Sequence, residues 1–297
     1  MNVSEIKPNY LNTRLVGILR TKPGTSAINA ITAIEAAFNS EAEAVEITSN
    51  SDFWQEILSA CVKKKLNIGV GSIKNEKTAK EAIDLGAKFL VSPGFFEDAI
   101  NAANKSNIPI LPGVFTKPNF KQAVDLKIAD VKFFPANAKT HEELFKAIRE
   151  PFRDEFEELN KSGWEIIPYD PNNKTSSRGE PLVIESPTEF YKLYLKIKNQ
   201  KPYGSIVIKL NEGPVGFDRL KDFSGQLKSF GMRTYAVGGV NDKNMKEVLT
   251  KYNAYGVCPG SGMFNADAIF SGDFERVKTD VRRHVAIIRE IFAVGAE

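Results

Sequence analysis

The chain has 297 residues, of which 42% are hydrophobic and 26% charged, and its formal net charge is +3. This composition is typical of a globular protein, and so small a charge gives no reason to expect nucleic acid as a partner. No apolar run in the sequence approaches the roughly 18 residues of a membrane-spanning helix, so no membrane association is expected.

Strand-like and helix-like segments alternate along the first half of the chain. Apolar runs bounded by turn residues predict strands at 15–19, 44–48, 67–71, 88–92, 108–111 and 130–136. Amphipathic stretches predict helices at 26–39, 52–65, 76–85, 97–105, 120–126 and 141–148. Two further strands, 233–237 and 255–258, precede helices at 242–252 and 273–293. Because consecutive strand–helix units pair in parallel, the count predicts an α/β fold, a (β/α)8 TIM barrel. A doubly wound open sheet is the alternative, but its usual glycine-rich dinucleotide motif is missing from the sequence.

A long stretch, 152–230, separates the sixth predicted helix from the seventh predicted strand. Its strand-like runs at 164–167 and 206–208, and its amphipathic runs at 187–198 and 217–229, indicate an inserted α/β subdomain. We therefore predict a single barrel domain over residues 1–297, interrupted at 152–230. A segment in this position leaves the barrel opposite the usual active-site face, which favours a structural or oligomeric role.

The chemistry of the predicted barrel centres on a lysine within an apolar strand. Lys132 lies in the middle of 130–136, where burial lowers the pKa of an amine, and a neutral amine can attack a carbonyl. Side chains alternate along the strand at 44–48, which sends Glu46 into the same barrel interior. The two groups can be a nucleophile and a proton-transfer carboxylate, or a buried ion pair with no chemical role.

Small and polar residues follow the carboxyl ends of the predicted strands, where barrel enzymes hold their active sites. Glycine there lets backbone amides approach an anion, and the last two such loops of a barrel often bind phosphate. Ordinary turn glycines produce the same pattern. The candidate binding residues at these strand ends are Ser72, Pro93, Gly94, Gly113, Gly238, Gly239, Gly260 and Ser261.

Few residues in the chain could bind a transition metal, because it has only two cysteines and two histidines. We predict no metal site and no cofactor. Cys61 and Cys258 lie far apart, and Met1 to Glu5 lack the order of a signal peptide, so a cytoplasmic location is expected. Cys258 is predicted to pack in the core and His284 to lie on the surface.

Taken together, these residues resemble one known family, the 2-keto-3-deoxy-6-phosphogluconate and 4-hydroxy-2-oxoglutarate aldolases. The resemblance is carried by 45–48, 92–94, 131–136, 237–240 and 260–274, and it covers about residues 15–152 and 233–281. It implies a pyruvate-dependent class I aldolase on a trimeric barrel. By this likeness Lys132 forms a Schiff base with pyruvate and Glu46 shuttles protons. The resemblance further implies that Pro93 and Thr116 line the pyruvate pocket and that Gly238, Gly239 and Ser261 bind the phosphate.

Some positions depart from the family pattern. Phosphogluconate-type enzymes have an arginine where this chain has Asn50. The 6-phosphogalactonate branch is similar to this chain at Asn50 and around Arg20, so Arg20 or Asn50 would hold an anionic group of the substrate. Ser72 replaces the usual threonine and keeps the hydroxyl. The strand 130–136, in contrast, resembles the phosphogluconate branch.

The sequence thus predicts an aldehyde-lyase that reversibly cleaves a 2-keto-3-deoxy-6-phospho sugar acid to pyruvate and glyceraldehyde 3-phosphate. Amides near Gly94 and Gly113 would help to hold the carboxylate. We expect a homotrimer whose partner is a small phosphorylated keto acid. The alternatives are a 4-hydroxy-2-oxoglutarate aldolase, a phosphosugar isomerase with Glu46 as base, and a non-enzymatic protein that binds sugar phosphates.

Overall fold

The computed structural model describes residues 11–170, 181–202, 205–210 and 215–292. The amino terminus considered above for targeting lies outside this part of the chain. Among the described helices, none combines the length and the apolar composition that crossing a membrane requires.

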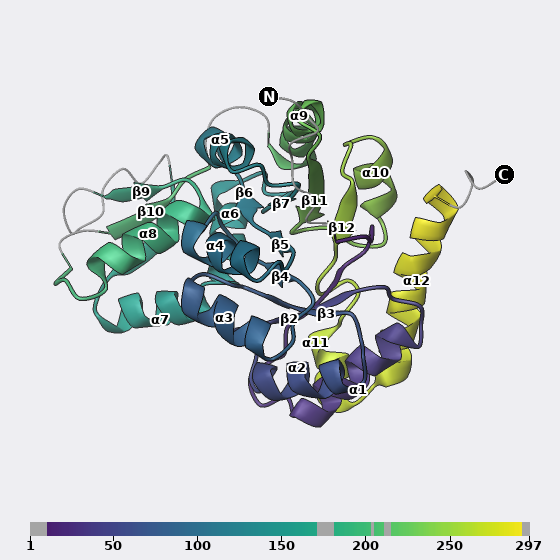
Figure 1. Cartoon of the computed structure of the whole chain (residues 1–297). Coiled ribbons are helices and arrows are strands. Elements are labelled where there is room, and N and C mark those ends of the chain that lie inside the picture. The colour runs from purple at the N-terminus through teal and green to yellow at the C-terminus, as the bar shows by residue number, and fades with distance from the viewer. Residues whose placement is uncertain (1–10, 171–180, 203–204, 211–214, 293–297) are drawn as a thin grey trace.

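Short parallel strands form the wall of a closed barrel (Figure 1). They are β1 (Gly17–Leu19), β2 (Val45–Thr48), β3 (Ile68–Gly71), β4 (Leu90–Val91), β5 (Ile110–Leu111), β6 (Gly113–Val114), β7 (Asp130–Phe133), β11 (Arg233–Val237) and β12 (Gly256–Cys258). Their order is β1-β2-β3-β4-β5 in one sheet and β12-β11-β7-β6 in the other. Because β5 and β6 are halves of one strand interrupted at Pro112, the wall has eight strand positions. A bridge from Leu15 to Val257 closes the barrel between β1 and β12, so the predicted TIM-barrel-like α/β fold is confirmed.

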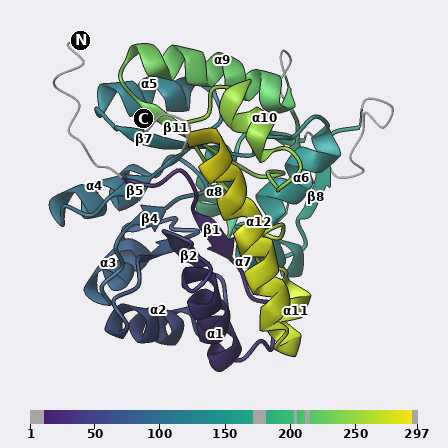
Figure 2. The ribbon, with the colours of Figure 1, turned by 90° about the vertical axis from the view of Figure 1, so that its right-hand side faces the viewer.

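Helices surround this wall and close into a ring. The helices on the outside are α1 (Ala27–Phe38), α2 (Trp54–Lys63), α3 (Glu76–Asp84), α4 (Glu97–Lys105), α5 (Lys117–Asp125), α9 (Gly216–Ser229), α10 (Met245–Thr250), α11 (Ala266–Ser271) and α12 (Phe274–Phe292). Ser26 caps α1 by accepting a hydrogen bond from the Asn29 amide. The long α12 lies against α1 and α10, which joins the two ends of the ring (Figures 1 and 2).

Alternation along each strand divides the core into two layers. Val45 and Ile47 of β2 join the large apolar cluster between the strands and the helices. Phe134, Val237 and Cys258 belong to a smaller cluster inside the barrel. Glu46 and Lys132 point into this interior, as the sequence predicted, and the exposed fraction of each residue is 5% or less.

The sixth helix of the barrel is α9, not the helix that immediately follows the sixth strand. In α9, Phe223 packs on Phe133 of β7 with ring centroids 5.0 Å apart, and on Phe120 of α5 at 6.0 Å. Phe217 of the same helix lies 5.4 Å from Tyr252, which follows α10. Helix α9 therefore fills the place between α5 and α10, and Figure 2 shows it beside α5.

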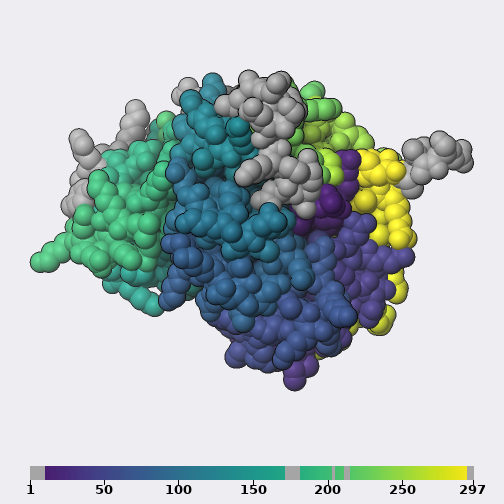
Figure 3. Space-filling model, viewed as in Figure 1, coloured from purple at the N-terminus to yellow at the C-terminus, as the bar shows by residue number. Residues whose placement is uncertain are grey.

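The segment between β7 and α9 stands outside the barrel. It contains α6 (His141–Arg149), α7 (Arg153–Lys161), β8 (Glu165–Pro168), β9 (Leu182–Ile184), α8 (Pro187–Ile197) and β10 (Ser205–Ile208). The three strands pair in parallel in the order β8-β10-β9. Figure 3 shows this teal-to-green part as a lobe beside the barrel. The Gly216 amide donates to the Ala138 carbonyl at 3.0 Å, so the segment leaves and rejoins the barrel at one place. We call residues 139–215 the insert.

The predicted position of the insertion, between the sixth helix and the seventh strand at 152–230, was therefore wrong. The 217–229 stretch assigned to it belongs to the barrel, and the 141–148 helix assigned to the barrel packs on β8 and β10. The physical reason is that α6 and α9 both have one apolar face, and local sequence does not say which sheet that face covers. The insert follows β7 directly, so it lies at the carboxyl-terminal ends of the strands, and the argument for a role away from the active-site face fails.

Candidate active site

The side chain of Glu46 lies in the barrel interior, directly against Gly71 of β3. A Cβ atom at Gly71 of β3 would lie 1.5 Å from Oε1 of Glu46 and 2.2 Å from its Cδ, so only glycine fits beneath this carboxyl group. Oε2 of Glu46 is buried and has no hydrogen-bond partner within the described residues. A buried carboxyl group without a partner is costly when charged, which favours a protonated Glu46.

Lys132 projects from β7 into the same interior. In the part of the chain that the structure describes, its Nζ atom forms no hydrogen bond or ion pair, and it lies 4.8 Å from the centroid of the Phe134 ring. Its backbone is fixed in the ladder, since Lys132 pairs with Gly113 of β6 and Tyr235 of β11. The strand therefore fixes the backbone of Lys132 and leaves its amine available to react.

The electrostatics of the two groups favour their neutral forms. Burial raises the pKa of the Glu46 carboxyl above its ordinary value, and the charges of Lys132 and Arg20 oppose that rise. Burial lowers the pKa of the Lys132 amine, while the charge of Glu46 opposes the fall and Arg20 adds to it. A neutral amine is a nucleophile, and a carboxyl group with a raised pKa can both give and take a proton near neutral pH.

A cavity of about 820 Å³ opens over these two groups. Apart from Ile18, Glu46 and Lys132, which lie within strands, its lining residues on the barrel end strands or follow them at their carboxyl ends, where barrel active sites lie. Among the predicted site residues, those that line the cavity are Arg20, Glu46, Ser72, Lys132, Gly238, Gly239, Gly260 and Ser261. The structure thus brings together the two predicted catalytic groups, both glycine-rich loops and one arginine.

Two glycines shape the loop after β11. Gly238 and Gly239 have φ angles of +94° and +74°, which other residues rarely adopt. A Cβ atom at Gly239 would lie 2.7 Å from Cβ of Asn137. Close approach of the backbone is thus built into this loop, as an anion-binding loop requires.

The remaining predicted site residues do not line the cavity. The Thr116 hydroxyl donates to Oδ1 of Asn119 at the start of α5. The other residues outside the lining are Asn50, Pro93, Gly94 and Gly113. A Cβ atom at Gly94 would lie 2.9 Å from Oγ1 of Thr188, so α8 of the insert covers this glycine. The substrate-binding roles of these residues stay predictions.

The insert supplies a wall of the cavity that the sequence did not predict. Its lining residues are Lys146, Ala147, Glu150, Pro151 and Arg153. Nη1 of Arg20 pairs with Oε2 of Glu150 at 2.8 Å. Nothing local marks these residues as part of a site; only the place where the insert leaves the barrel brings them there.

Two other residues complete the comparison with the sequence predictions. Cys258 is buried beside Lys132 and lines the cavity, and burial raises the pKa of its thiol, which fits the predicted packing role. His284 was predicted to lie on the surface, but it is fully buried and its Nδ1 lies 2.7 Å from the Asp280 carbonyl oxygen. It is buried because α12 packs against α1, α10 and α11. No cluster of three or more potential metal-ligating side chains occurs among the described residues.

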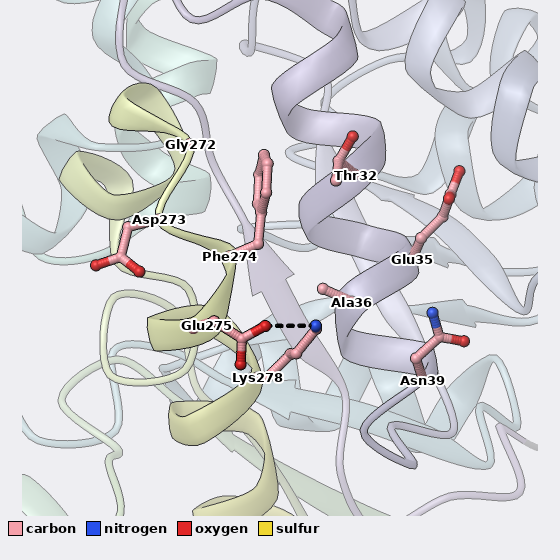
Figure 4. A pocket seen from close by; sticks show the side chains of 9 residues that line it. All are labelled: Thr32, Glu35, Ala36, Asn39, Gly272, Asp273, Phe274, Glu275 and Lys278. Atoms are coloured by element: carbon pink, nitrogen blue, oxygen red, sulfur yellow. Dashed lines mark hydrogen bonds and ion pairs between the residues drawn. The ribbon is translucent and has the colours of Figure 1, made fainter.

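A second cavity, of about 390 Å³, lies between α1 and the start of α12 (Figure 4). Its charged side chains have partners: Glu275 pairs with Lys278 at 2.7 Å, and Glu35 of α1 pairs with Lys64. These groups come from the outer helices, so the cavity has the character of a solvated groove rather than a reactive centre.

Comparison with known proteins identifies the family. The model described as KDPG and KHG aldolase matches residues 8–156, which is half of the chain. The chain belongs to the KDPG and KHG aldolase family. The matched range holds β1 to β7 and both central groups of this family member, Glu46 and Lys132.

Individual relatives agree with this assignment. The chain is 30% identical to the KHG/KDPG aldolase of Escherichia coli K12 over 110 residues, which are 36% of this chain and 52% of that enzyme. It is 30% identical to the 2-dehydro-3-deoxy-phosphogluconate aldolase of Haemophilus influenzae over 128 residues, which are 43% of this chain and 56% of that enzyme. The chain thus spans about half the length of the curated relatives it matches.

Solved structures share the fold over nearly the whole chain. A native KDPGal structure superposes with a TM-score of 0.61 and 19% identity, covering 95% of this chain and 97% of that one. The KDPG aldolase of Legionella pneumophila, with pyruvate captured as a covalent carbinolamine intermediate, gives a TM-score of 0.59 and 17% identity over 91% and 93% of the two chains. At these identities the likeness establishes the fold alone.

Proposed function

We propose that this protein is a class I aldolase that reversibly cleaves a 2-keto-3-deoxy-6-phospho sugar acid to pyruvate and glyceraldehyde 3-phosphate. The observation that carries the proposal is the buried, unpaired amine of Lys132, which shares one cavity with the buried carboxyl group of Glu46. Membership of the KDPG and KHG aldolase family supports the same reaction.

The proposed reaction begins at the lysine. Neutral Lys132 attacks the C2 ketone, and protonated Glu46 gives its proton to the hydroxyl that leaves the carbinolamine as water. The carboxylate of Glu46 then takes the proton of the C4 hydroxyl. The C3–C4 bond breaks, its electron pair moves into the iminium to form an enamine, and the aldehyde departs. Glu46 returns the proton to C3, and water releases pyruvate from the lysine.

The glycine-rich loops that line the cavity suit the phosphate of such a substrate. Gly238, Gly239 and Ser261 are proposed to hold the phosphate through backbone amides and a hydroxyl. A 4-hydroxy-2-oxoglutarate aldolase is the second candidate, since the matching family model covers both activities. The ratio of kcat/KM for the two substrates separates them, because only the first substrate has a phosphate.

The direct test is reduction with borohydride in the presence of pyruvate, followed by peptide mapping. Only an iminium can be reduced onto the chain, so a stable adduct on Lys132 is expected. The Lys132→Arg variant should give none, because a guanidinium stays protonated and cannot form an imine. A label on another lysine, or no label in the wild-type protein, would refute the proposed mechanism.

The insert is proposed to be an α/β subdomain that interrupts a single barrel domain. Its own parallel sheet and the stacked rings of Phe156 and Phe190, 4.6 Å apart, support this view. A homotrimer in the cytoplasm stays our prediction for the assembly and location. Solution mass and cell fractionation test them.

A further inference from the structure

The insert is fixed against the barrel at the edge of the active-site cavity. Lys74, which follows β3, pairs with Glu155 of α7 at 2.5 Å, and both side chains are largely buried at 12% and 9% exposure. The amide of Phe95 donates to Oγ1 of Thr188 in α8 at 2.9 Å. Phe96 packs on Phe152 with ring centroids 6.5 Å apart. A wall with this many contacts can position side chains for binding.

Asn50, just after β2, connects the barrel to the cavity-lining part of the insert. Its side-chain amide donates to the Glu150 carbonyl at 3.0 Å. Its own carbonyl accepts a hydrogen bond from Nη2 of Arg153 at 2.8 Å. Asn50 is only 9% exposed and the Arg153 side chain is 35% exposed, so these partly buried bonds hold the guanidinium of Arg153 at the carboxyl end of β2.

Two arginines of the described residues line the cavity, and they differ in their carboxylate partners. Arg20 is paired with a carboxylate of the insert, since its Nη1 lies 2.8 Å from Oε2 of Glu150, whose side chain is 66% exposed, while its buried Nε has no partner among the described residues. Among the described residues, the carboxylate paired with Arg153 is that of the exposed Asp154, whose Oδ1 lies 3.7 Å from Nε, outside hydrogen-bond range. Its guanidinium therefore keeps donors for a ligand, and the fork of such a group matches a carboxylate.

The place of Arg153 indicates which anionic end of the substrate it can reach. In a 2-keto acid the carboxylate is bonded to the ketone carbon that Lys132 attacks. Glu46 must reach the same carbons, and Glu46 lies on β2, the strand whose carboxyl end holds Arg153. The glycine loops proposed for the phosphate follow β11 and β12, and β1 lies between them and β2 in the closed barrel.

We propose that Arg153 of the insert binds the carboxylate of the keto acid and so selects 2-keto acids over uncharged ketones. Glu150 and Asn50 act as positioning residues: one neutralises Arg20 and the other fixes Arg153. This inference rests on the proposed aldolase function. Binding by Arg153 makes the insert part of the substrate site, although residues 139–215 do not belong to the barrel.

The test compares pyruvate with its uncharged analogue pyruvamide in borohydride trapping. In the wild-type protein, pyruvate should saturate at a lower concentration than pyruvamide. Arg153→Met should raise the half-saturating concentration of pyruvate by about 10- to 100-fold and leave that of pyruvamide nearly unchanged. Arg153→Lys should lie between the two, because it keeps the charge and loses the fork. Arg149→Met is the matched control, since Arg149 is exposed and lies outside the cavity lining.

The preference for pyruvate over pyruvamide distinguishes carboxylate binding by Arg153 from a general loosening of the insert. Loosening would raise the half-saturating concentrations of both ligands equally. An unchanged preference in Arg153→Met overturns the inference while leaving the aldolase intact. A second measurement does not depend on imine formation. Calorimetric binding of pyruvate to Lys132→Met should weaken by the same factor when Arg153→Met is added, and equal binding by the two proteins refutes a carboxylate site at Arg153.

Discussion

Gly71 offers a test of whether the placement of Glu46 matters for proton transfer. The change Gly71→Ala adds a methyl group 1.5 Å from Oε1 of Glu46, whereas ordinary contacts begin at 3.4 Å. The carboxyl group must therefore retreat by about 2 Å. Its strand is fixed in the ladder between β1 and β3, so the side chain has to move by changing its rotamer.

The expected effect on chemistry is large because general acid–base catalysis depends on position. A positioned proton-transfer group contributes about 100- to 10,000-fold, and a displacement of about 1 Å can cost about 100-fold. We therefore expect deuterium exchange at the methyl group of pyruvate to slow by at least about 100-fold in Gly71→Ala. Overpacking should also lower the free energy of unfolding by about 1–3 kcal/mol.

Two further variants make the interpretation specific. Gly69→Ala adds a methyl group 2.4 Å from the Phe89 ring, so it overpacks the same strand and its nearest neighbours are atoms of Phe89 rather than of Glu46. It should lose stability and keep exchange within a few-fold of the wild-type rate. In a Glu46→Ala background, Gly71→Ala should cost little stability, since the group it strikes is gone. Wild-type exchange in Gly71→Ala would refute the reasoning that Glu46 must occupy this position.

Three other predictions follow from the cavity and the insert. Because burial lowers the pKa of Lys132, the rate of borohydride trapping should rise with pH and level off below the ordinary lysine pKa of 10.5. Any negative charge on Glu46 raises the pKa of Lys132, so Glu46→Gln should move the inflection to lower pH, and a shift to higher pH would contradict the assignment. Lys132→Met should raise the free energy of unfolding by about 1 kcal/mol at pH 7, because the unfolded lysine is charged there and the folded one resists charging. This gain should shrink as the pH approaches 10.5. Denaturant melts at the two pH values measure it, and a gain that grows with pH would refute the sign. Replacing 139–215 with two glycines should leave a folded barrel by circular dichroism, since Ala138 and Gly216 are already joined by a backbone hydrogen bond. The half-saturating pyruvate concentration in borohydride trapping should rise. An unchanged concentration would exclude a substrate role for the insert.

Much of the candidate site followed from patterns that span only a few residues. Alternation along β2 and β7 placed Glu46 and Lys132 in the interior, because the direction of a strand side chain depends only on its position in the pleat. The glycines after β11 were found because glycine at a strand end lets the backbone approach a ligand closely and readily adopts the positive φ angles seen there. Such inferences succeed when the deciding physics is local.

The residues of the insert that line the cavity could not be found in this way. Glu150 and Arg153 follow an ordinary amphipathic helix, and their chemistry comes from contacts with Arg20 and Asn50, about 100 residues or more away in the chain. The sequence did hold one signal that the 217–229 helix belongs to the barrel and not to the insert. Helix α9 ends at Ser229, a few residues before β11 begins, which is the usual spacing of a barrel helix and its next strand.

The sequence by itself determined the alternating strands and helices, the closed parallel barrel that they form and the two reactive side chains inside it. Only the tertiary structure decided which helix completes the sixth unit, and hence on which face the insert stands. The physical reason is that an apolar helix face specifies burial and not the partner that buries it. Leu144 of α6 and Leu220 of α9 are equally buried, yet one helix contacts β8 and β10 while the other contacts β11 of the barrel.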